Sequence, residues 1–425
     1  MPCRGRQGAA MKTYDVMVIG SGFAGMAAAL FAARRGLSVA QTGATGGIDF
    51  STGFIDLLAV HPITEQKVWE DPFAALAALR RDLPAHPYCR VSDAEICRAL
   101  EEFTLFLGEH GLCYRGRAGK NTLTLTSAGT MKPTYLMPCT AWNGVEAWEA
   151  KAPALIVDFH GLKGLSARQI AEVRKDSWPE LKVARIKFPG MSGELYPEHM
   201  AWSMADPARR AELAISVAPL AGDVDYVGFP AILGMTDTAA VLRHLEELLG
   251  KRVFEIPTLP PSIAGPRLRA AFDRGLPTLG VRTYTQKLIT RAVCSDEGFH
   301  FTAGSGSTSV ELFARSAILA SGRFFGKGLK ADRHRIQEAV FDLPVTQPED
   351  RSLWHRPEFF DPRGHEVNQA GVETDEALRP LNAQGRVFHP RLHAAGAILA
   401  HQDWMRMKCG AGLAIATAYK AVASL

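Results

Sequence analysis

The chain has 425 residues, of which 47% are hydrophobic and 22% are charged, as is typical of a folded globular protein with room for two domains. The net charge of +4 is small and spread along the chain, which argues against a nucleic-acid partner. The longest apolar runs, such as Met26–Ala33, have about eight residues, whereas a membrane-spanning helix needs roughly 20. We therefore expect a cytoplasmic protein that reaches a membrane only through a partner.

The cysteine residues are odd in number and none belongs to a C-x-x-C pair. This pattern predicts no disulfide framework, no metal site and no iron–sulfur cluster, and it indicates a reducing compartment. The seven are Cys3, Cys89, Cys97, Cys113, Cys139, Cys294 and Cys409. Residues 1–10 show no periodicity, so we expect either a disordered extension or a translation start at Met11.

A glycine fingerprint follows the first predicted strand, Tyr14–Ile19, and precedes a predicted helix, Met26–Arg35. Gly20 permits a tight turn, Gly22 lets the backbone approach a pyrophosphate, and Gly25 lets the helix pack closely on the strand. A phosphate at this place would meet the free N–H groups of a helix N-terminus. The order of strand, G-x-G-x-x-G and helix predicts a dinucleotide or flavin site; the alternative is a glycine-rich turn in an unrelated α/β fold.

The acidic residue that usually completes this fingerprint is missing. An Asp or Glu about 20 residues downstream normally binds the ribose hydroxyls, but Gln41 and Thr42 follow the second predicted strand, Leu37–Ala40. Gln41 can accept one hydrogen bond without the help of a charge, so it would hold the adenosine ribose less firmly. The sequence therefore favours FMN, with FAD on an altered anchor as the alternative and an empty relic of the site as a third interpretation.

Residues 61–255 alternate between strands and helices. Strands are predicted over Ala154–Phe159, Leu181–Phe188 and Val224–Gly228, and helices over Ser166–Lys175 and Thr238–Gly250. This pattern predicts an inserted α/β domain with its own sheet, which interrupts a domain formed by residues 11–60 and 256–425.

Three further elements point to the same cofactor cleft. A predicted strand ends at Gly322, another ends at Gly396, and Gly410 and Gly412 open a C-terminal helix, Leu413–Ala423. Short strand-like runs over residues 288–310 predict a β-meander before the first of these strands. Together with the fingerprint, this order predicts a discontinuous α/β flavoprotein: a Rossmann-like domain of the glutathione-reductase type with an inserted α/β domain.

Five sequence blocks carry a more specific signal. They are Asp49–Leu58 (DFSTGFIDLL), Pro84–Tyr88 (PAHPY), Pro257–Ile263 (PTLPPSI), Gly371–Pro380 and Gly410–Gly412. The set closely resembles the B subunit of anaerobic glycerol-3-phosphate dehydrogenase, over nearly the whole chain from Met11. The first and third blocks are much more specific than the glycine fingerprint.

The resemblance implies one member of a heterotrimer that oxidises sn-glycerol 3-phosphate to dihydroxyacetone phosphate and passes electrons to menaquinone. It implies a flavoprotein A subunit, an FMN-binding B subunit, and an iron–sulfur C subunit that brings the complex to the inner face of the cell membrane. The loop His401–Lys408 is bulkier and more basic than the glycine-rich loop of the family. Whether the B subunit or its partner oxidises the substrate stays open.

The site residues follow from the motifs and from this resemblance. The expected cofactor-binding residues are Gly20, Gly22, Gly25, Gln41, Gly46, Gly47, Ser51, Thr52, Gly322, Gly396, Gly410 and Gly412. His401 and Lys408 are the catalytic candidates, because a cation beside the flavin would stabilise its anionic reduced form; the alternative is a solvated loop. Lys132 and Arg379 are candidates for a phosphate contact, with surface charge as the blander interpretation.

Two other functions remain open at this stage. The chain could be a stand-alone flavin-dependent oxidoreductase of a small organic acid, or a degenerate flavoprotein that serves as a docking subunit. Flavin content separates the docking protein from the two enzymes. Co-purification with an iron–sulfur protein separates the dehydrogenase subunit from the stand-alone enzyme.

Overall fold

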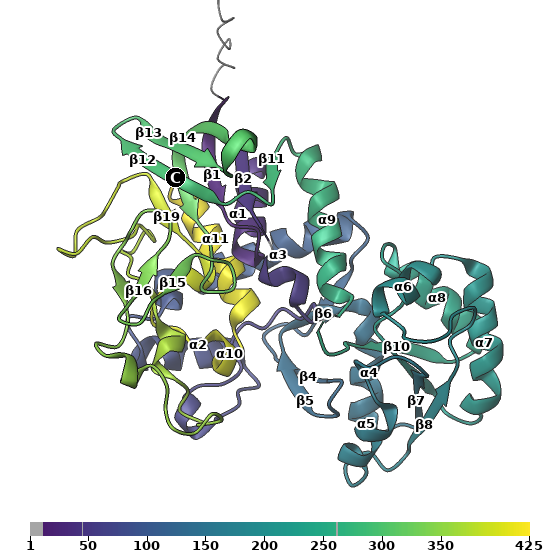
Figure 1. Ribbon diagram of the computed structural model, residues 1–425. Helices are drawn as coiled ribbons and strands as arrows, with labels where there is room; N and C mark the ends of the chain where they lie inside the picture. Colours follow the sequence, from purple (N-terminus) through teal and green to yellow (C-terminus); the bar gives the residue numbers. More distant parts are fainter. Residues whose placement is uncertain (1–11, 45, 261) are drawn as a thin grey trace, which may run out of the picture.

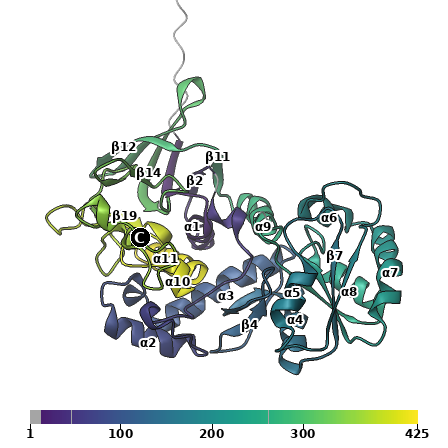
Figure 2. The same ribbon diagram turned by 60° about the horizontal axis from the view of Figure 1, so that its bottom comes forward.

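The computed structural model describes residues 12–44, 46–260 and 262–425. The extension expected over residues 1–10 lies outside these ranges. Two units lie side by side in both views (Figures 1 and 2). The larger unit contains both ends of the described chain, and the smaller one is formed by the middle of the sequence, coloured teal.

A seven-stranded sheet organises the larger unit, with the order β11-β2-β1-β14-β13-β12 and with β19 paired to β14. Its strands are β1 (Lys12–Ile19), β2 (Val39–Gly43), β11 (Arg282–Thr285), β12 (Ile289–Ser295), β13 (Gly298–Ala303), β14 (Val310–Leu319) and β19 (Leu392–Ala394). The pairs formed by β12, β13 and β14 are antiparallel, as the predicted meander requires, and the other pairs are parallel. Strands from distant parts of the sequence share one sheet, which confirms the discontinuous Rossmann-like domain.

Helices from both ends of the chain form the core of this unit. They are α1 (Phe23–Arg34), α2 (Pro72–Asp82), α3 (Asp93–Glu109), α9 (Ala264–Thr278), α10 (Trp404–Met407) and α11 (Gly410–Ala423). Helix α1 is rich in alanine and is buried continuously from Ala24 to Ala32. Small side chains let neighbouring helices approach closely, and α11 lies beside α1 in the core (Figure 1).

The smaller unit has a parallel four-stranded sheet with the order β10-β9-β7-β8. Its strands are β7 (Ala154–Phe159), β8 (Leu181–Ile186), β9 (Tyr226–Pro230) and β10 (Arg252–Ile256), and its helices are α4 (Cys139–Ala150), α5 (Ala167–Arg174), α6 (Pro197–Ser203), α7 (Pro207–Ala221) and α8 (Thr238–Leu249). The three predicted strands and two predicted helices of the insertion are thus confirmed.

Short strand pairs complete the fold. They are β3 (Tyr114–Gly116) with β6 (Leu136–Pro138), β4 (Thr122–Leu125) with β5 (Met131–Thr134), β15 (Leu329–Ala331) with β16 (Ile336–Glu338), and β17 (Val345–Thr346) with β18 (Gly371–Val372). Within the described ranges, no helix is long and apolar enough to cross a membrane.

The packing of α2 and α3 bears on the domain boundaries. We expected the insertion to begin at residue 61, but Leu76 of α2 and Phe103 and Phe106 of α3 are buried in the core of the larger unit. The core of the smaller unit includes Leu125, Ala147 and the strand over Ala154–Phe159. We therefore propose that the insertion begins near Cys113, after α3.

The expectation of no disulfide is wrong for one pair. Cys113 and Cys139 are joined, with their Cα atoms 5.4 Å apart. An odd cysteine count and the lack of a C-x-x-C motif do not exclude a pair that the fold brings together. Cys89, Cys97, Cys294 and Cys409 are free.

A buried ion pair joins the two units. Arg267 of α9 donates two hydrogen bonds of 2.8 Å to the carboxylate of Glu255 in β10. Its Nε donates a third, of 2.7 Å, to the carbonyl of Gly234. Both charged side chains are less than 5% exposed, so α9 and the second sheet are fastened together in a place that water does not reach.

Candidate functional site

The glycine turn lies where β1 meets α1, and two of its glycines are required by close approach. Gly20 has a φ of 137°, and a Cβ there would lie 2.1 Å from the carbonyl oxygen of Ala320. A Cβ on Gly25 would lie 2.2 Å from the carbonyl oxygen of Gly20. The structure thus confirms the tight turn at Gly20 and the close packing of helix on strand at Gly25.

Open space lies next to three other predicted glycines. A Cβ on Gly22 would approach only the backbone nitrogen of Gly47, at 3.7 Å, and a Cβ on Gly47 or Gly322 would meet nothing within 4 Å. Gly22 is the residue directly before α1, where the first N–H groups of the helix have no partner within it. The local helix dipole also favours an anion here.

The segment after β2 closes over the glycine turn. Ser21 Oγ donates a 2.9 Å hydrogen bond to the carbonyl of Ala44, and a Cβ on Gly46 would lie 2.1 Å from the carbonyl oxygen of Ser21. Arg269 of α9 donates to the same carbonyl of Ser21 at 3.2 Å. These contacts fix Gly46 beside the turn.

The second strand does not end at Ala40 as predicted. Strand β2 continues to Gly43, where a Cβ would lie 2.5 Å from Ser21 Oγ, so the strand end has no room for an acidic side chain. Gln41 and Thr42 are both buried. The amide nitrogen of Gln41 donates a 3.0 Å hydrogen bond to the carbonyl of Gly20 and so stabilises the glycine turn. The Oε1 atom of Gln41 has no hydrogen-bond partner.

Ser51 and Thr52 begin the segment that leads to Asp56. Both are partly exposed. Ser51 Oγ accepts a 3.3 Å hydrogen bond from the N–H of Gly53, which is the turn-capping contact that was the alternative for this residue. Gly53 has a φ of 77°, a conformation that favours glycine.

Two of the downstream glycines serve packing. Gly396 has a φ of 77°, and a Cβ there would lie 2.5 Å from Cβ of Ala24 in α1. The N–H of Gly412 donates a 2.9 Å hydrogen bond to the carbonyl of Asp56, and a Cβ on it would lie 2.6 Å from the same oxygen. The N–H of Gly412 is therefore used within the protein and is not free to bind a cofactor. Gly410 instead faces the ring of Trp404.

His401 forms a pair with a carboxylate that the sequence did not single out. Its Nε2 contacts Glu373, and Glu373 also accepts a 2.8 Å hydrogen bond from Thr346. The hydrogen bond from His401 holds the pKa of Glu373 below its usual value. In contrast, Asp375 pairs with Arg379 at 2.6 Å, so Arg379 is a surface ion pair rather than a free phosphate contact.

Lys408 lies at the turn between α10 and α11, with a φ of 53°. Burial and the nearby charge of Lys132 lower its pKa. Lys132 itself, on β5, forms a 2.6 Å ion pair with Asp56. The residue after Lys408, Cys409, is fully buried, and burial raises the pKa of its thiol, so it is a packed side chain and not a reactive thiolate.

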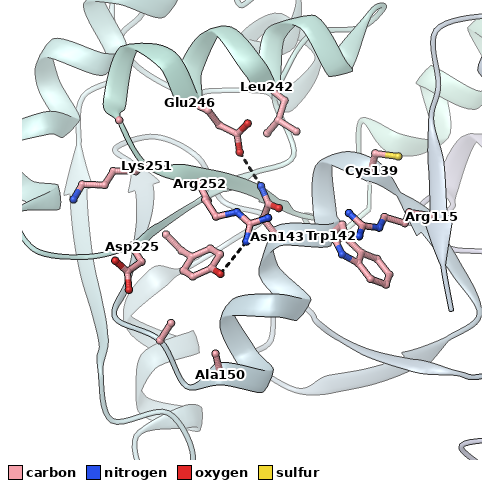
Figure 3. Close-up of a pocket in the computed structure, with 13 residues that line it drawn as sticks. Arg115, Cys139, Trp142, Asn143, Ala150, Asp225, Leu242, Glu246, Lys251 and Arg252 are labelled. Atoms are coloured by element: carbon pink, nitrogen blue, oxygen red, sulfur yellow. Dashed lines mark hydrogen bonds between the residues drawn. The ribbon is translucent and has the colours of Figure 1, made fainter.

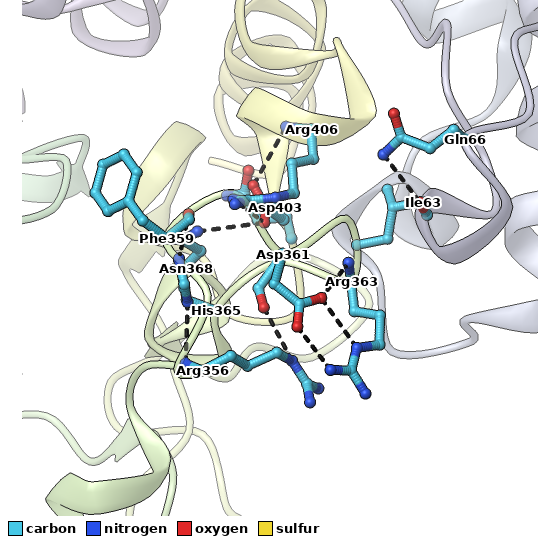
Figure 4. Close-up of polar contacts among 12 residues, drawn as sticks. Ile63, Gln66, Arg356, Phe359, Asp361, Arg363, His365, Asn368, Asp403 and Arg406 are labelled. Carbon is cyan, nitrogen blue, oxygen red and sulfur yellow. Dashed lines mark hydrogen bonds and ion pairs between the residues drawn. The ribbon is translucent and has the colours of Figure 1, made fainter.

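A buried polar network fixes the loop before Lys408. Asp403 caps α10 by accepting from the N–H of Arg406, and it also accepts from the side chains of Asn368 and Arg406 (Figure 4). Arg323, directly after Gly322, donates to the carbonyl groups of Ala397, Gln402 and Asn368. Burial lowers the pKa of Arg323 to about 10.

Tyr88 packs the PAHPY block against the DFSTGFIDLL block. It is fully buried and donates a 2.7 Å hydrogen bond to the carbonyl of Leu57. His86 caps the same short turn by accepting from the N–H of Tyr88. Burial lowers the pKa of His86 to about 3, so this imidazole is neutral and acts as a hydrogen-bond acceptor.

A separate cavity of about 870 Å³ lies at the smaller unit (Figure 3). Arg115 lies over the ring of Trp142, and Arg252 pairs with Glu146 at 2.6 Å. None of the predicted site residues lines this cavity.

Comparison with known proteins places the fold in a family. A sequence model described as "FAD binding domain" matches residues 15–413. The B subunit of anaerobic glycerol-3-phosphate dehydrogenase from Yersinia pseudotuberculosis is 30% identical, covering 95% of this chain and 96% of that protein. The B subunit from Vibrio cholerae is 31% identical, covering 97% and 96%, and the probable B subunit from Halobacterium salinarum is 32% identical, covering 96% of each.

The chain belongs to the family of these B subunits. It is thereby a flavoprotein of the FAD-binding class and a member of the flavin-dependent oxidoreductases. Among solved structures, the 3-ketosteroid Δ1-dehydrogenase from Sterolibacterium denitrificans covers 97% of this chain and 99% of its own, at 13% identity and a TM-score of 0.44.

The preference for FMN is not supported, because the matching family binds FAD. The missing acid misled us. It removes a contact to the adenosine ribose, but the glycine turn and the N-terminus of α1 address the pyrophosphate, which only FAD contains. The open space beside Gly22, Gly47 and Gly322 fits such a group.

Proposed function

We propose that this chain is the flavoprotein B subunit of an anaerobic, respiratory glycerol-3-phosphate dehydrogenase. The complex oxidises sn-glycerol 3-phosphate to dihydroxyacetone phosphate and passes the electrons to menaquinone. The observation that carries the proposal is an intact glycine cradle in a chain similar to B subunits over 95% of its length. The partners are the flavoprotein A subunit and the iron–sulfur C subunit, through which the chain associates with the membrane.

FAD would supply a two-electron acceptor that no side chain offers. Gly20, Gly22 and Gly25 with the N-terminus of α1 would hold its pyrophosphate. Gly46 and Gly47 would close over it, and Gly322, Ser51 and Thr52 would lie along the rest of the cofactor. Gln41 would not contact the cofactor but would hold the carbonyl of Gly20 in place.

His401 and Glu373 would form a general-base pair beside the substrate. Glu373 occupies Nε2 of the imidazole, which leaves Nδ1 as the nitrogen that accepts a proton from a substrate hydroxyl. The carboxylate would orient the ring. Lys408, from the same loop, would supply a positive charge.

We expect the purified chain to contain FAD, and Gly22→Val to empty the site without unfolding the protein. The φ of Gly22 is −84°, which a β-branched residue adopts readily, and its Cβ has room. Only the space for the cofactor would be filled, so FAD affinity should fall by about tenfold or more, which corresponds to roughly 1.4 kcal/mol. Acid extraction with chromatography identifies the flavin, and thermal unfolding of the flavin-free proteins checks stability.

Gly108→Val is the matched control, because Gly108 lies in α3 and its Cβ would meet nothing within 4 Å. It should keep its full FAD content. Extraction of FMN alone, or full FAD occupancy in Gly22→Val, would contradict the proposed cradle.

We also expect the chain by itself to reduce no quinone with glycerol 3-phosphate. Within the described residues, no cluster of His, Cys, Asp or Glu side chains could hold a metal ion, so the proposed electron route needs a partner. Co-expression with the A and C subunits should restore quinone reduction. Assays of dye reduction and of quinone reduction, with the chain alone and in the complex, distinguish the two steps. Quinone reduction by the isolated chain would sink this prediction.

A further inference from the structure

Three segments far apart in the sequence meet at the junction of the two units. Asp56 follows the Ser51–Gly53 turn, Lys132 lies on β5 of the β4–β5 hairpin near the start of the insertion, and Lys408 precedes α11. The ion pair of Lys132 and Asp56 holds the hairpin against the larger unit; in Figure 1, β4 and β5 lie near α10. Ligand sites occur preferentially at such junctions.

The charges at this place do not balance. Lys132 and Asp56 neutralise one another at 2.6 Å, with side chains that are 21% and 14% exposed. Asp403 lies near Lys408 but is paired with Arg406 at 3.3 Å. The ammonium group of Lys408 has neither an ion pair nor a hydrogen bond within the described part of the chain, although it is partly buried.

A partly buried ammonium without a direct partner is unfavourable, because it loses water and gains no hydrogen bond, and the carboxylates near Lys408, Asp56 and Asp403, are each paired with another cation. An oxyanion bound between Lys408 and Lys132 would supply that charge and form short charge-assisted hydrogen bonds. The arrangement also contains an acceptor. The Oδ1 atom of Asp56 has no hydrogen-bond partner, and a hydroxyl group would satisfy it. A cation pair beside a free carboxylate oxygen therefore matches a ligand that has both an anionic head and a hydroxyl.

We propose that Lys408 and Lys132 bind the phosphate group of the substrate and that Asp56 accepts a hydrogen bond from one of its hydroxyls. The substrate class is a hydroxylated phosphate monoester. This inference rests on the proposed function and assigns residues to its substrate site. All three residues contact the substrate, and Lys132 in addition positions Asp56 through their ion pair.

The test is the steady-state kinetics of Lys408→Met in the complex with the A and C subunits, by dye reduction. Loss of one charge-assisted contact should raise KM for glycerol 3-phosphate by about tenfold or more, with a smaller change in kcat. Inhibition by inorganic phosphate should weaken by a similar factor, and Lys408→Arg should recover most of the affinity. Lys182→Met is the control, since Lys182 is exposed on β8 and its removal should leave both constants unchanged.

A second measurement keeps this inference separate from the proposed function. Calorimetric titration of the FAD-loaded chain with inorganic phosphate needs no turnover, and Lys408→Met should weaken binding by about tenfold or more. FAD content and melting temperature check that Lys408→Met is folded. If it is not folded, the same titration is made with Lys132→Met. Equal phosphate affinity in wild type and Lys408→Met, or no phosphate binding by the wild type, overturns the site. A complex that binds phosphate through Lys408 but does not oxidise glycerol 3-phosphate overturns the proposed function alone.

Discussion

Replacing Arg267 with methionine is expected to lower the free energy of unfolding by about 3–5 kcal/mol, because it leaves a buried carboxylate without its counter-charge. Glu255 is 5% exposed, so water cannot replace the two hydrogen bonds that Arg267 donates to it. Chemical denaturation with urea measures the loss. Arg274→Met is the matched control, since Arg274 is exposed on the same helix, and surface substitutions usually change stability by about 0.5 kcal/mol or less.

The stability of the wild type and that of Arg267→Met should depend on pH with opposite signs. Burial alone would raise the pKa of Glu255, but the charge and hydrogen bonds of Arg267 outweigh burial and hold the pKa below its usual value. The wild-type pair therefore contributes its full stability above the ordinary glutamate pKa of about 4.3, and this contribution is lost as the pH falls through the folded-state pKa.

In Arg267→Met the pKa of Glu255 should instead rise, since burial, the largest influence, would then be opposed only by the hydrogen bonds from Thr140 and from the N–H of Leu233. Acidification should therefore recover part of the lost stability. The double variant Glu255→Gln/Arg267→Met should be more stable than Arg267→Met at pH 7, because it buries no unpaired charge. Thermal unfolding from pH 7 down to about pH 2, below the ordinary glutamate pKa, follows both effects. A single variant that is as stable as the wild type at neutral pH would show that the pair does not fasten the two units.

Gly412→Val is expected to cost about 3 kcal/mol of stability, near the upper end for an over-packed site. Its Cβ would lie 2.6 Å from the carbonyl oxygen of Asp56 and 2.9 Å from Cα of Leu57. Both are backbone atoms and cannot turn aside as a flexible side chain would. The 2.9 Å hydrogen bond from Gly412 to Asp56 would be strained as well. Thermal unfolding of the variant and of Gly108→Val as control measures this effect.

The same variant tests what the start of α11 does. Because the N–H of Gly412 is already used by Asp56, we expect FAD that remains bound to keep the wild-type reduction potential. Spectroelectrochemical titration of the flavin-loaded variant provides the value. A shifted potential in a variant of unchanged stability would mean that this helix end acts on the flavin directly.

Elements with a strong local pattern were predictable. The glycine turn between β1 and α1 follows from glycine spacing and flanking periodicity, and Gly20 and Gly25 have the close contacts that this motif demands. Strand β7 matches its predicted bounds, Ala154–Phe159, because a buried apolar run with clear ends needs no distant information. The end of β2 was misplaced, since nothing local distinguishes Ala40 from Gly43 as the last strand residue.

Residue types and their spacing thus determined the cofactor class, the discontinuous sheet and the order of its elements. Only the tertiary structure decided which distant groups meet: Cys113 with Cys139, Glu373 with His401, and Lys132 with Asp56. Each of these contacts depends on how helices and strands pack, and a single charged residue or cysteine carries no periodic signal of its partner. The sequence therefore singled out Lys132 and Lys408 as candidates, but only the tertiary structure brought Asp56 to Lys132.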